Sequence, residues 1–182
     1  PVSGKMHVIG KSVRSQLHSV PDCQRIVKKA VVESMKNTYQ REVFSETGAV
    51  YKIEIGLLKD MATITVDTSG EGLHRRGYRE HSGAAPLKET LAAALVLISG
   101  YDGTRPLIDS FCGSGTILVE AAMIARHIAP NVDRTFVCET WPTFDPEVFE
   151  QVREGAKNQV KSMKLSLTGY DNDTYVLSTA RM

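Results

Sequence analysis

Hydrophobic and polar positions in the first third of the chain follow strand and helix spacings in turn. Residues 50–58 alternate hydrophobic and polar side chains, and residues 62–67 resume the alternation after Lys59-Asp60, which predicts a hairpin of two strands. A short strand is predicted at residues 6–9. Hydrophobic residues then recur at helical spacing after Pro21 and predict a helix over about residues 22–36. Residues 1–67 are therefore expected to form a small α+β unit.

From residue 85 onward the pattern is that of an α/β fold. Helices are predicted at residues 86–99, 116–128, 146–163 and from 174 onward, strands at 106–109 and 165–170, and an irregular stretch at 129–146. Turn-forming residues followed by clustered arginines separate the two patterns at residues 68–84 and predict a basic linker. We therefore expect an N-terminal unit, this linker, and the first part of a second domain over residues 85–182.

Composition narrows the class of protein without identifying it. The 182 residues carry 22 Lys and Arg against 21 Asp and Glu, so the chain is not a highly basic nucleic-acid binder. This balance of charge is compatible with a local basic patch. No run of 18 apolar residues occurs, which predicts no membrane span. The three cysteines form no C-x-x-C pair and the histidines have no ligand spacing, so we expect reduced thiols, a cytoplasmic protein and no metal. The absence of an initiator Met suggests a piece cut from a longer protein.

A glycine loop carries the strongest functional signal. In Leu107-Ile108-Asp109-Ser110-Phe111-Cys112-Gly113-Ser114-Gly115-Thr116, an apolar strand ends in an acid, two glycines follow, and a helix begins at once. Glycines allow a tight turn and close approach of a ligand, and the helix N-terminus adds free N–H groups. In open α/β folds such a loop lies at the carboxyl edge of the sheet, where nucleotides bind.

The loop matches neither of two common nucleotide motifs. It has no Lys where a Walker loop requires one, and Leu118 occupies the third glycine position of a dinucleotide fingerprint, which argues against a nucleotide-dependent oxidoreductase. The next predicted strand ends in Asp171, which is suited to accept hydrogen bonds from both ribose hydroxyls. Asp171 lies 62 residues after Asp109 (171 − 109), so we interpret the sequence between them as an insertion. A simple turn residue at the strand end is the alternative for Asp171.

At Asp109–Thr116, followed by Glu120-Ala121-Ala122, the chain resembles the class I methyltransferases that use S-adenosylmethionine. Residues 67–79 and 85–94 resemble more narrowly the enzymes that methylate guanine N2 in large-subunit ribosomal RNA, whose members are often labelled N6-adenine-specific DNA methylases. Residues 11–30 resemble the end of the THUMP RNA-binding domain of these enzymes. The resemblance implies a THUMP-type RNA-binding unit followed by the first part of a Rossmann-like methyltransferase domain.

The resemblance also implies roles for individual residues. Gly113, Ser114 and Gly115 would pack against the methionine part of the cofactor, and Asp109 would stand behind its amino group, through water. Asp171 would hold the ribose and Asn172 would lie near the adenine. The expected cofactor-binding set is Leu87, Glu89, Asp109, Cys112, Gly113, Ser114, Gly115, Thr116, Asp171 and Asn172. We expect Cys112 to be a packing residue rather than a nucleophile, since no His lies within ten residues of it.

The sequence departs from the family at two points. Ser110 stands where the family usually has Pro, which removes no ligand group. No Asn/Asp-Pro-Pro-Tyr/Phe element, which holds the target amine and stacks on the flipped base, occurs in the chain. We therefore expect this catalytic element to lie beyond Met182.

Basic residues suggest where RNA would bind. Three guanidiniums flank an aromatic ring in Arg75-Arg76-Gly77-Tyr78-Arg79, a combination that suits phosphate contact and base stacking. A strip facing RNA could also form from Lys11, Arg14, Arg25, Lys28 and Lys29, for which a solvated charged face is the alternative. Ion pairs with Glu71 or Glu80 are the alternative for the arginine cluster.

These observations predict an S-adenosylmethionine-dependent methyltransferase that acts on guanine N2 of 23S rRNA, of which this chain carries the RNA-binding and cofactor-loop parts. An N6-adenine-specific nucleic-acid methylase and an inactive RNA-binding protein with a vestigial cofactor fold remain alternatives. Dimerisation through an exposed sheet edge is left open.

Overall fold

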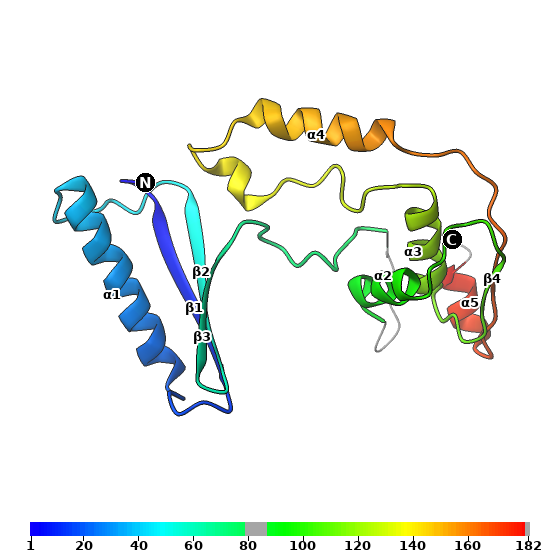
Figure 1. Cartoon of the computed structure of the whole chain (residues 1–182), viewed down its shortest axis with the longest axis horizontal. Helices are drawn as coiled ribbons and strands as arrows, with labels where there is room; N and C mark the ends of the chain where they lie inside the picture. The colour runs from blue at the N-terminus through cyan, green and yellow to red at the C-terminus, as the bar shows by residue number, and fades with distance from the viewer. Residues whose placement is uncertain (79–86, 181–182) are drawn as a thin grey trace. The chain divides into compact units, whose positions relative to one another are not determined.

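The structure is a computed structural model that describes residues 1–78 and 87–180 (Figure 1). The chain forms two compact units, and each unit is made of two separate stretches of the sequence. Residues 1–70 together with 135–146 form the first unit, and residues 71–134 together with 147–182 form the second. Each unit has its own hydrophobic core.

The N-terminal unit contains β1 (Lys5–Val13), α1 (Val20–Tyr39), β2 (Val50–Leu58) and β3 (Met61–Asp67). Its sheet has the order β1-β2-β3, with β1 and β2 parallel and β2 and β3 antiparallel. The parallel pair needs a crossover, which α1 provides, and the antiparallel pair needs only the Lys59-Asp60 turn. Met6, Met35 and Ile53 form the buried centre between α1 and the sheet.

β1 (Lys5–Val13) extends beyond the predicted residues 6–9, and α1 (Val20–Tyr39) extends beyond the predicted residues 22–36. All nine residues of β1 pair with β2, from Lys5 opposite Val50 to Val13 opposite Leu58, so the polar residues Lys11 and Ser12 are included in the strand. Backbone pairing with a long neighbour extends the strand beyond its apolar segment.

The C-terminal unit contains α2 (Glu89–Ile98), β4 (Leu107–Asp109), α3 (Thr116–Ala125), β5 (Leu167–Gly169) and α5 (Thr174–Ala180). β4 and β5 are parallel, with Leu107 opposite Leu167 and Asp109 opposite Gly169. Val96, Tyr101, Ala121 and Ala125 form the buried centre where α2 packs on α3.

α4 (Pro146–Asn158) is shorter than the predicted helix, which extends to residue 163. The residues after Asn158 leave the helix, and Met163 and Leu165 pack against the core of the C-terminal unit. Their burial at a spacing of two favours extended backbone over another helical turn. No helix among the described residues is both long and apolar enough to cross a membrane.

A short 3-10 helix, η1 (Val137–Thr140), lies in the segment that the sequence predicts to be irregular. Trp141 follows it and donates an indole N–H hydrogen bond to the carbonyl of Val50 at 2.9 Å. This segment therefore packs on the N-terminal sheet, although in sequence it lies between two parts of the C-terminal unit.

Candidate cofactor site

The parallel pairing of β4 with β5 brings two distant acids to one edge of the sheet. Asp109 is the last residue of β4, and Asp171 follows β5 by two residues. Beyond the paired strands the backbones stay together: the amide of Tyr170 donates to the carbonyl of Asp109, and the amide of Cys112 donates to the carbonyl of Tyr170, both at 2.8 Å. Asp109, the glycine loop and Asp171 therefore lie together at the carboxyl end of this sheet.

The glycine loop has the backbone that its sequence suggests. Gly113 has φ 53° and Gly115 has φ 80°, a region that side-chain-bearing residues rarely adopt. Gly115 is the N-cap of α3, which begins at Thr116. The first turn of a helix carries N–H groups without partners inside the helix and the positive end of its dipole, so this end of α3 is suited to an anionic group such as a carboxylate.

The carboxylate of Asp171 holds the glycine loop. One oxygen accepts a hydrogen bond from the amide of Gly113 at 2.9 Å, and the other accepts one from the amide of Asp173 at 3.0 Å. These hydrogen bonds, first that of Asp173 and then that of Gly113, lower the pKa of Asp171 below its usual value. The residue thus stays ionised at neutral pH and is tied to the loop on which the methionine part is expected to bind.

Asp109 supplies a buried acceptor beside the loop. Its Oδ1 accepts a hydrogen bond from the amide of Phe111 at 3.1 Å. Its Oδ2 is buried and has no hydrogen-bond partner among the described residues. An orphaned carboxylate oxygen at this position fits a ligand or water that donates hydrogen bonds, such as the ammonium group of an amino acid.

Cys112 packs between the loop and β5. A Cβ atom added to Gly169 would lie 2.8 Å from Sγ of Cys112 and 2.8 Å from Cδ1 of Leu118, so the glycine makes room for both side chains. Burial, reinforced by the negative charges of Asp109 and Asp171, raises the pKa of the Cys112 thiol. A protonated, buried thiol is a poor nucleophile, as expected for a packing residue. Leu118, which breaks the dinucleotide motif, is thus part of the packing beneath the loop.

Leu87 and Glu89 lie at the start of α2 rather than in the loop itself. Glu89 is buried, and its charge contributes to raising the pKa of Glu120 on α3, after the larger effect of burial. The two carboxylates therefore lie in one buried polar region where α2 packs against α3. Asn172 is exposed in the turn after β5.

Glu120 organises two residues that the sequence suggested for RNA contact. Nε of Arg76 lies 2.9 Å from Oε1 of Glu120, with side chains only 9% and 3% exposed, and the hydroxyl of Tyr78 donates to the same oxygen at 2.9 Å. Arg76 and Tyr78 thus anchor the linker to α3 through Glu120, whereas the sequence suggested Glu71 or Glu80 as ion-pair partners. Glu80 lies outside the described residues. The partner that sequence reasoning missed is Glu120, the one charged residue in the apolar helix Thr116–Ala125, and that isolation was the available signal.

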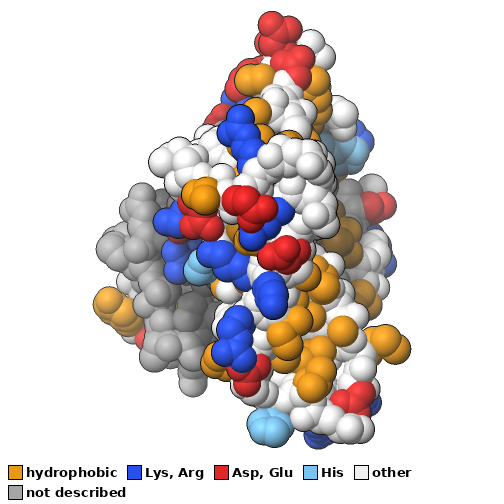
Figure 2. Space-filling model, turned by 90° about the vertical axis from the view of Figure 1, so that its left-hand side faces the viewer, with side chains coloured by type: hydrophobic (Ala, Val, Ile, Leu, Met, Phe, Trp, Pro, Cys, Tyr) orange, Lys and Arg blue, Asp and Glu red, His pale blue; other side chains and the backbone are white. Residues whose placement is uncertain are grey.

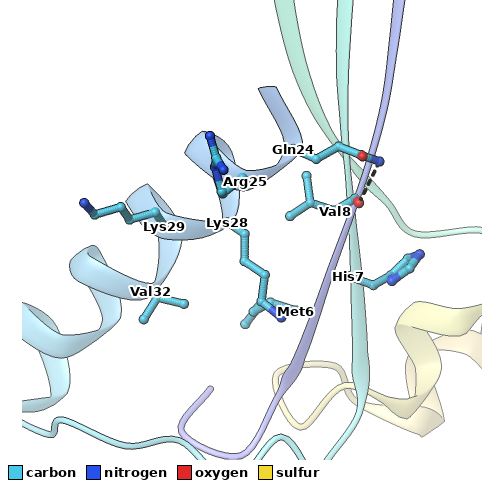
Figure 3. A pocket seen from close by; sticks show the side chains of 8 residues that line it. All are labelled: Met6, His7, Val8, Gln24, Arg25, Lys28, Lys29 and Val32. Carbon is cyan, nitrogen blue, oxygen red and sulfur yellow. Dashed lines mark hydrogen bonds between the residues drawn. The ribbon is translucent and has the colours of Figure 1, made fainter. Parts of the chain in front are cut away.

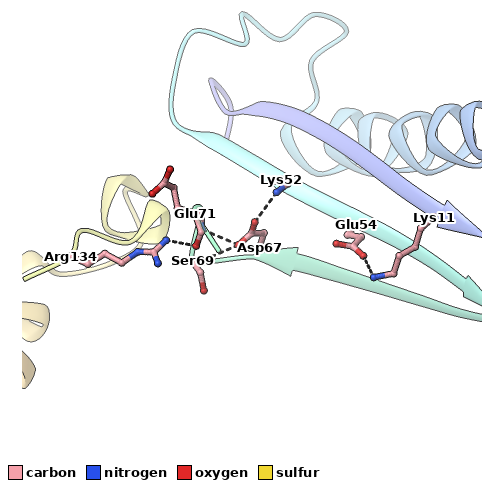
Figure 4. Close-up of polar contacts among 8 residues, drawn as sticks. Lys11, Lys52, Glu54, Asp67, Ser69, Glu71 and Arg134 are labelled. Atoms are coloured by element: carbon pink, nitrogen blue, oxygen red, sulfur yellow. Dashed lines mark hydrogen bonds and ion pairs between the residues drawn. The ribbon is translucent and has the colours of Figure 1, made fainter. Parts of the chain in front are cut away.

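The other basic residues suggested for RNA contact lie apart. Arg75 pairs with Glu71 on the exposed surface, Lys11 pairs with Glu54 across β1 and β2 (Figure 4), and Lys28 pairs with Glu46. Arg14 is exposed after β1. Arg79 lies outside the described residues.

A groove between α1 and β1 gathers further basic groups around Lys28. The residues that line it, drawn in Figure 3, are Met6, His7, Val8, Gln24, Arg25, Lys28, Lys29 and Val32. The side-chain amide of Gln24 donates a hydrogen bond to the carbonyl of Val8. Met6, Val8 and Val32 contribute apolar side chains to it, and Arg25, Lys28 and Lys29 come from α1. On the face drawn in Figure 2 basic and acidic side chains are mixed, so any basic site on that face is local.

The geometry defines a Rossmann-like cofactor-binding domain preceded by an α+β unit. Its binding groups fit S-adenosylmethionine, which carries an amine, a carboxylate and a ribose. They are the orphaned carboxylate oxygen of Asp109, the glycine turn, the N-terminus of α3 and the ionised Asp171 after β5. No group of three or more His, Cys, Asp or Glu side chains that could hold a metal ion occurs in the part of the chain that the structure describes.

Comparison with known families identifies both parts. Residues 76–182 match the RMKL-like methyltransferase domain, and residues 1–67 match the THUMP domain. The chain belongs to the RMKL-like methyltransferase family. These matches confirm the fold class predicted from the sequence and its resemblance to THUMP-containing methyltransferases.

Relatives and a solved structure agree with this family. The chain is 56% identical over 155 residues to the "Putative RNA methyltransferase YpsC" of Bacillus subtilis (strain 168), with 84% of this chain and 40% of that protein covered. It is 44% identical over 161 residues to the ribosomal RNA large subunit methyltransferase K/L of Vibrio cholerae serotype O1 (strain ATCC 39541 / Classical Ogawa 395 / O395), with 85% of this chain and 23% of that protein covered.

The crystal structure of SMU.472 complexed with SAH superposes on the chain with a TM-score of 0.88 and 40% identity, covering 100% of this chain and 48% of that one. The chain thus spans less than half the length of each of these three proteins.

Proposed function

We propose that the protein is an S-adenosylmethionine-dependent RNA methyltransferase that methylates the exocyclic N2 of a guanine in 23S rRNA, a cytoplasmic reaction. The observation that carries the cofactor assignment is the Asp171–Gly113 hydrogen bond, which joins the acid after β5 to the glycine loop after β4. The relative named ribosomal RNA large subunit methyltransferase K/L supports the RNA substrate, and the THUMP match supports an RNA-binding role for residues 1–67.

Each residue of the site has a task in this proposal. Bound S-adenosylmethionine supplies an electrophilic methyl group on its sulfonium. The loop Gly113–Gly115 and the start of α3 receive the methionine part. The carboxylate of Asp109 accepts a hydrogen bond from the amino group of that part, through water. Asp171 holds the loop through Gly113 and offers its carboxylate to the ribose; Leu87 and Glu89 border the site. The chain thus binds and orients the donor, which lowers the entropic part of the barrier to methyl transfer.

RNA binding is proposed for the α1–β1 groove together with Arg14, Lys11 and Arg75. Three cations along one helix suit a phosphate backbone, and their effect is expected to weaken with salt. Arg76 and Tyr78 support the linker rather than contact RNA directly, since Glu120 binds both and the Arg76–Glu120 pair is buried, whereas the ion pairs of Lys11, Lys28 and Arg75 lie at the surface.

Two measurements on the full-length protein test the proposal. Calorimetry with S-adenosylhomocysteine tests the cofactor, with NADH as the competing ligand; binding of NADH alone would overturn the assignment. Incubation with labelled S-adenosylmethionine and an unmodified 23S rRNA transcript, followed by nucleoside analysis, tests the reaction. N2-methylguanosine supports it, N6-methyladenosine supports the adenine-specific alternative, and RNA binding without cofactor binding supports the inactive alternative.

A further inference from the structure

The segment 135–146 is part of the methyltransferase match in sequence but part of the THUMP unit in packing. The family match covers residues 76–182. The structure nevertheless groups residues 135–146 with residues 1–70. A stretch of one domain's sequence is therefore built into the other domain's fold.

Trp141 anchors this segment on the N-terminal sheet. Its side chain is 7% exposed, its ring stacks on Tyr51 with centroids 4.5 Å apart, and its N–H bonds to the carbonyl of Val50 at 2.9 Å. Stacked aromatic pairs and a satisfied indole N–H are typical of firm anchors.

Backbone hydrogen bonds fix the beginning of the segment. The amide of Cys138 donates to the carbonyl of Thr68 at 3.1 Å, and the amide of Val137 donates to the carbonyl of Ser69 at 3.4 Å. Val137 also packs over Gly70, where an added Cβ would lie 3.4 Å from it. The segment thus joins the N-terminal unit at the point where the chain leaves β3.

The chain consequently passes between the two units three times, at residues 70–71, 134–135 and 146–147. A single linker leaves a tethered domain free to rotate about it, whereas additional connections reduce that freedom and raise the effective concentration of one site near the other. Methyl transfer depends on orientation, because a small misplacement of the reacting atoms slows it strongly.

We propose that segment 135–146, anchored by Trp141, is a second tether that orients the RNA held by the THUMP unit for methylation, which makes Trp141 a positioning residue. This inference rests on the proposed function. It concerns the rate of methyl transfer within the complex, and not the affinity of either unit for its own ligand.

The test is the single-turnover rate of methyl transfer to the 23S rRNA transcript at saturating RNA, measured on the full-length protein. That rate constant does not depend on the fraction of protein that is folded. Trp141→Ala is expected to lower it at least fivefold, with the dissociation constants for RNA and S-adenosylhomocysteine changed by less than about twofold. Trp141→Phe keeps the stacking on Tyr51 and is expected to stay within about twofold of the wild-type rate.

A control separates tethering from simple loss of stability. Tyr39→Ala removes an edge contact with Phe44 in the same unit and leaves in place the hydrogen bonds and the ring stacking that anchor segment 135–146. It is expected to lower thermal stability and leave the single-turnover rate unchanged. An equal loss of rate in Tyr39→Ala and Trp141→Ala would overturn the proposal.

A second variant keeps every contact of Trp141. Flexible Gly-Ser inserts after Arg134 and after Asp145 lengthen both connections of the segment and are expected to lower the same rate at least threefold. A wild-type rate in this variant overturns the proposal even if Trp141→Ala fails to fold. If the wild-type protein itself neither binds S-adenosylhomocysteine nor methylates RNA, the proposed function fails instead.

Discussion

The carboxylate of Asp171 accepts a hydrogen bond from the amide of Gly113, 58 residues earlier in the chain, at 2.9 Å. The contact joins the two loops that follow β4 and β5, so an acid suited to the ribose also fixes the loop suited to the methionine part. Both halves of the proposed cofactor site therefore depend on one side chain.

Replacing this side chain tests the arrangement. Asp171→Ala is expected to weaken binding of S-adenosylhomocysteine by about tenfold or more, because two backbone amides and the ribose hydroxyls lose an acceptor. Asp171→Asn keeps one acceptor oxygen and should lose less. Calorimetry on the full-length protein measures both, and equal affinity of Asp171→Ala and wild type would contradict the proposed role.

Gly169 leaves space for the residues beneath the loop. Gly169→Ala would bring a Cβ to 2.8 Å from both Cys112 and Leu118, so we expect a loss of about 1–3 kcal/mol in the free energy of unfolding. Gly155→Ala is the matched control, because its Cβ meets nothing within 4 Å in the helix α4 and should stabilise the protein by about 0.5–1 kcal/mol. Denaturant titration of both variants distinguishes crowding from a general effect of alanine.

The buried Arg76–Glu120 pair is expected to show strong coupling. Removing either partner leaves the other charge buried, at a cost of about 3–5 kcal/mol in the free energy of unfolding. The double variant Arg76→Met with Glu120→Leu should cost much less than the sum of the two single changes. A double-mutant cycle in urea measures the coupling energy, and additive losses would show that the pair does not act as a unit.

The thiol of Cys112 should resist modification. Its pKa is raised by burial and by two nearby carboxylates, so its thiolate fraction at pH 8 lies below that of an ordinary cysteine. Cys23 is only partly buried and is expected to react first with iodoacetamide, with the order read by peptide mass spectrometry. Preferential labelling of Cys112 in the folded protein would argue for a reactive rather than a packing role.

Asp67 couples stability to pH at the end of β3. Hydrogen bonds from Gly70, Lys52 and Ser69 (Figure 4) lower its pKa below the value in the unfolded chain. Its stabilising contribution is therefore complete above the unfolded value of about 4 and is lost as the pH falls through the lower folded value. Asp67→Asn should flatten this part of the curve of unfolding free energy against pH between about pH 5 and 2. An unchanged slope would assign the acid sensitivity to other carboxylates.

Local patterns in the sequence determined much of this molecule. Alternation marked β2 and β3, helical spacing marked α1 and α3, and the order acid, glycines, helix marked the cofactor loop, because these features depend on neighbours a few residues away. The ends of β1 and α4 were not predictable in this way. They depend on pairing with β2 and on the burial of Met163 and Leu165, which are contacts between distant parts of the chain.

The tertiary structure alone decided how the functional residues are used. Sequence placed Asp171 at the end of a strand, but only the pairing of β5 with β4 brought its carboxylate to Gly113. The sequence predicted that Arg76 and Tyr78 would contact RNA as part of a basic and aromatic motif. In the folded structure both side chains instead bind Glu120. Trp141 lies 90 residues after Tyr51 (141 − 51), and no local spacing relates them. A residue type sets the interactions a side chain can form, whereas its partner is selected by the packing of the whole unit.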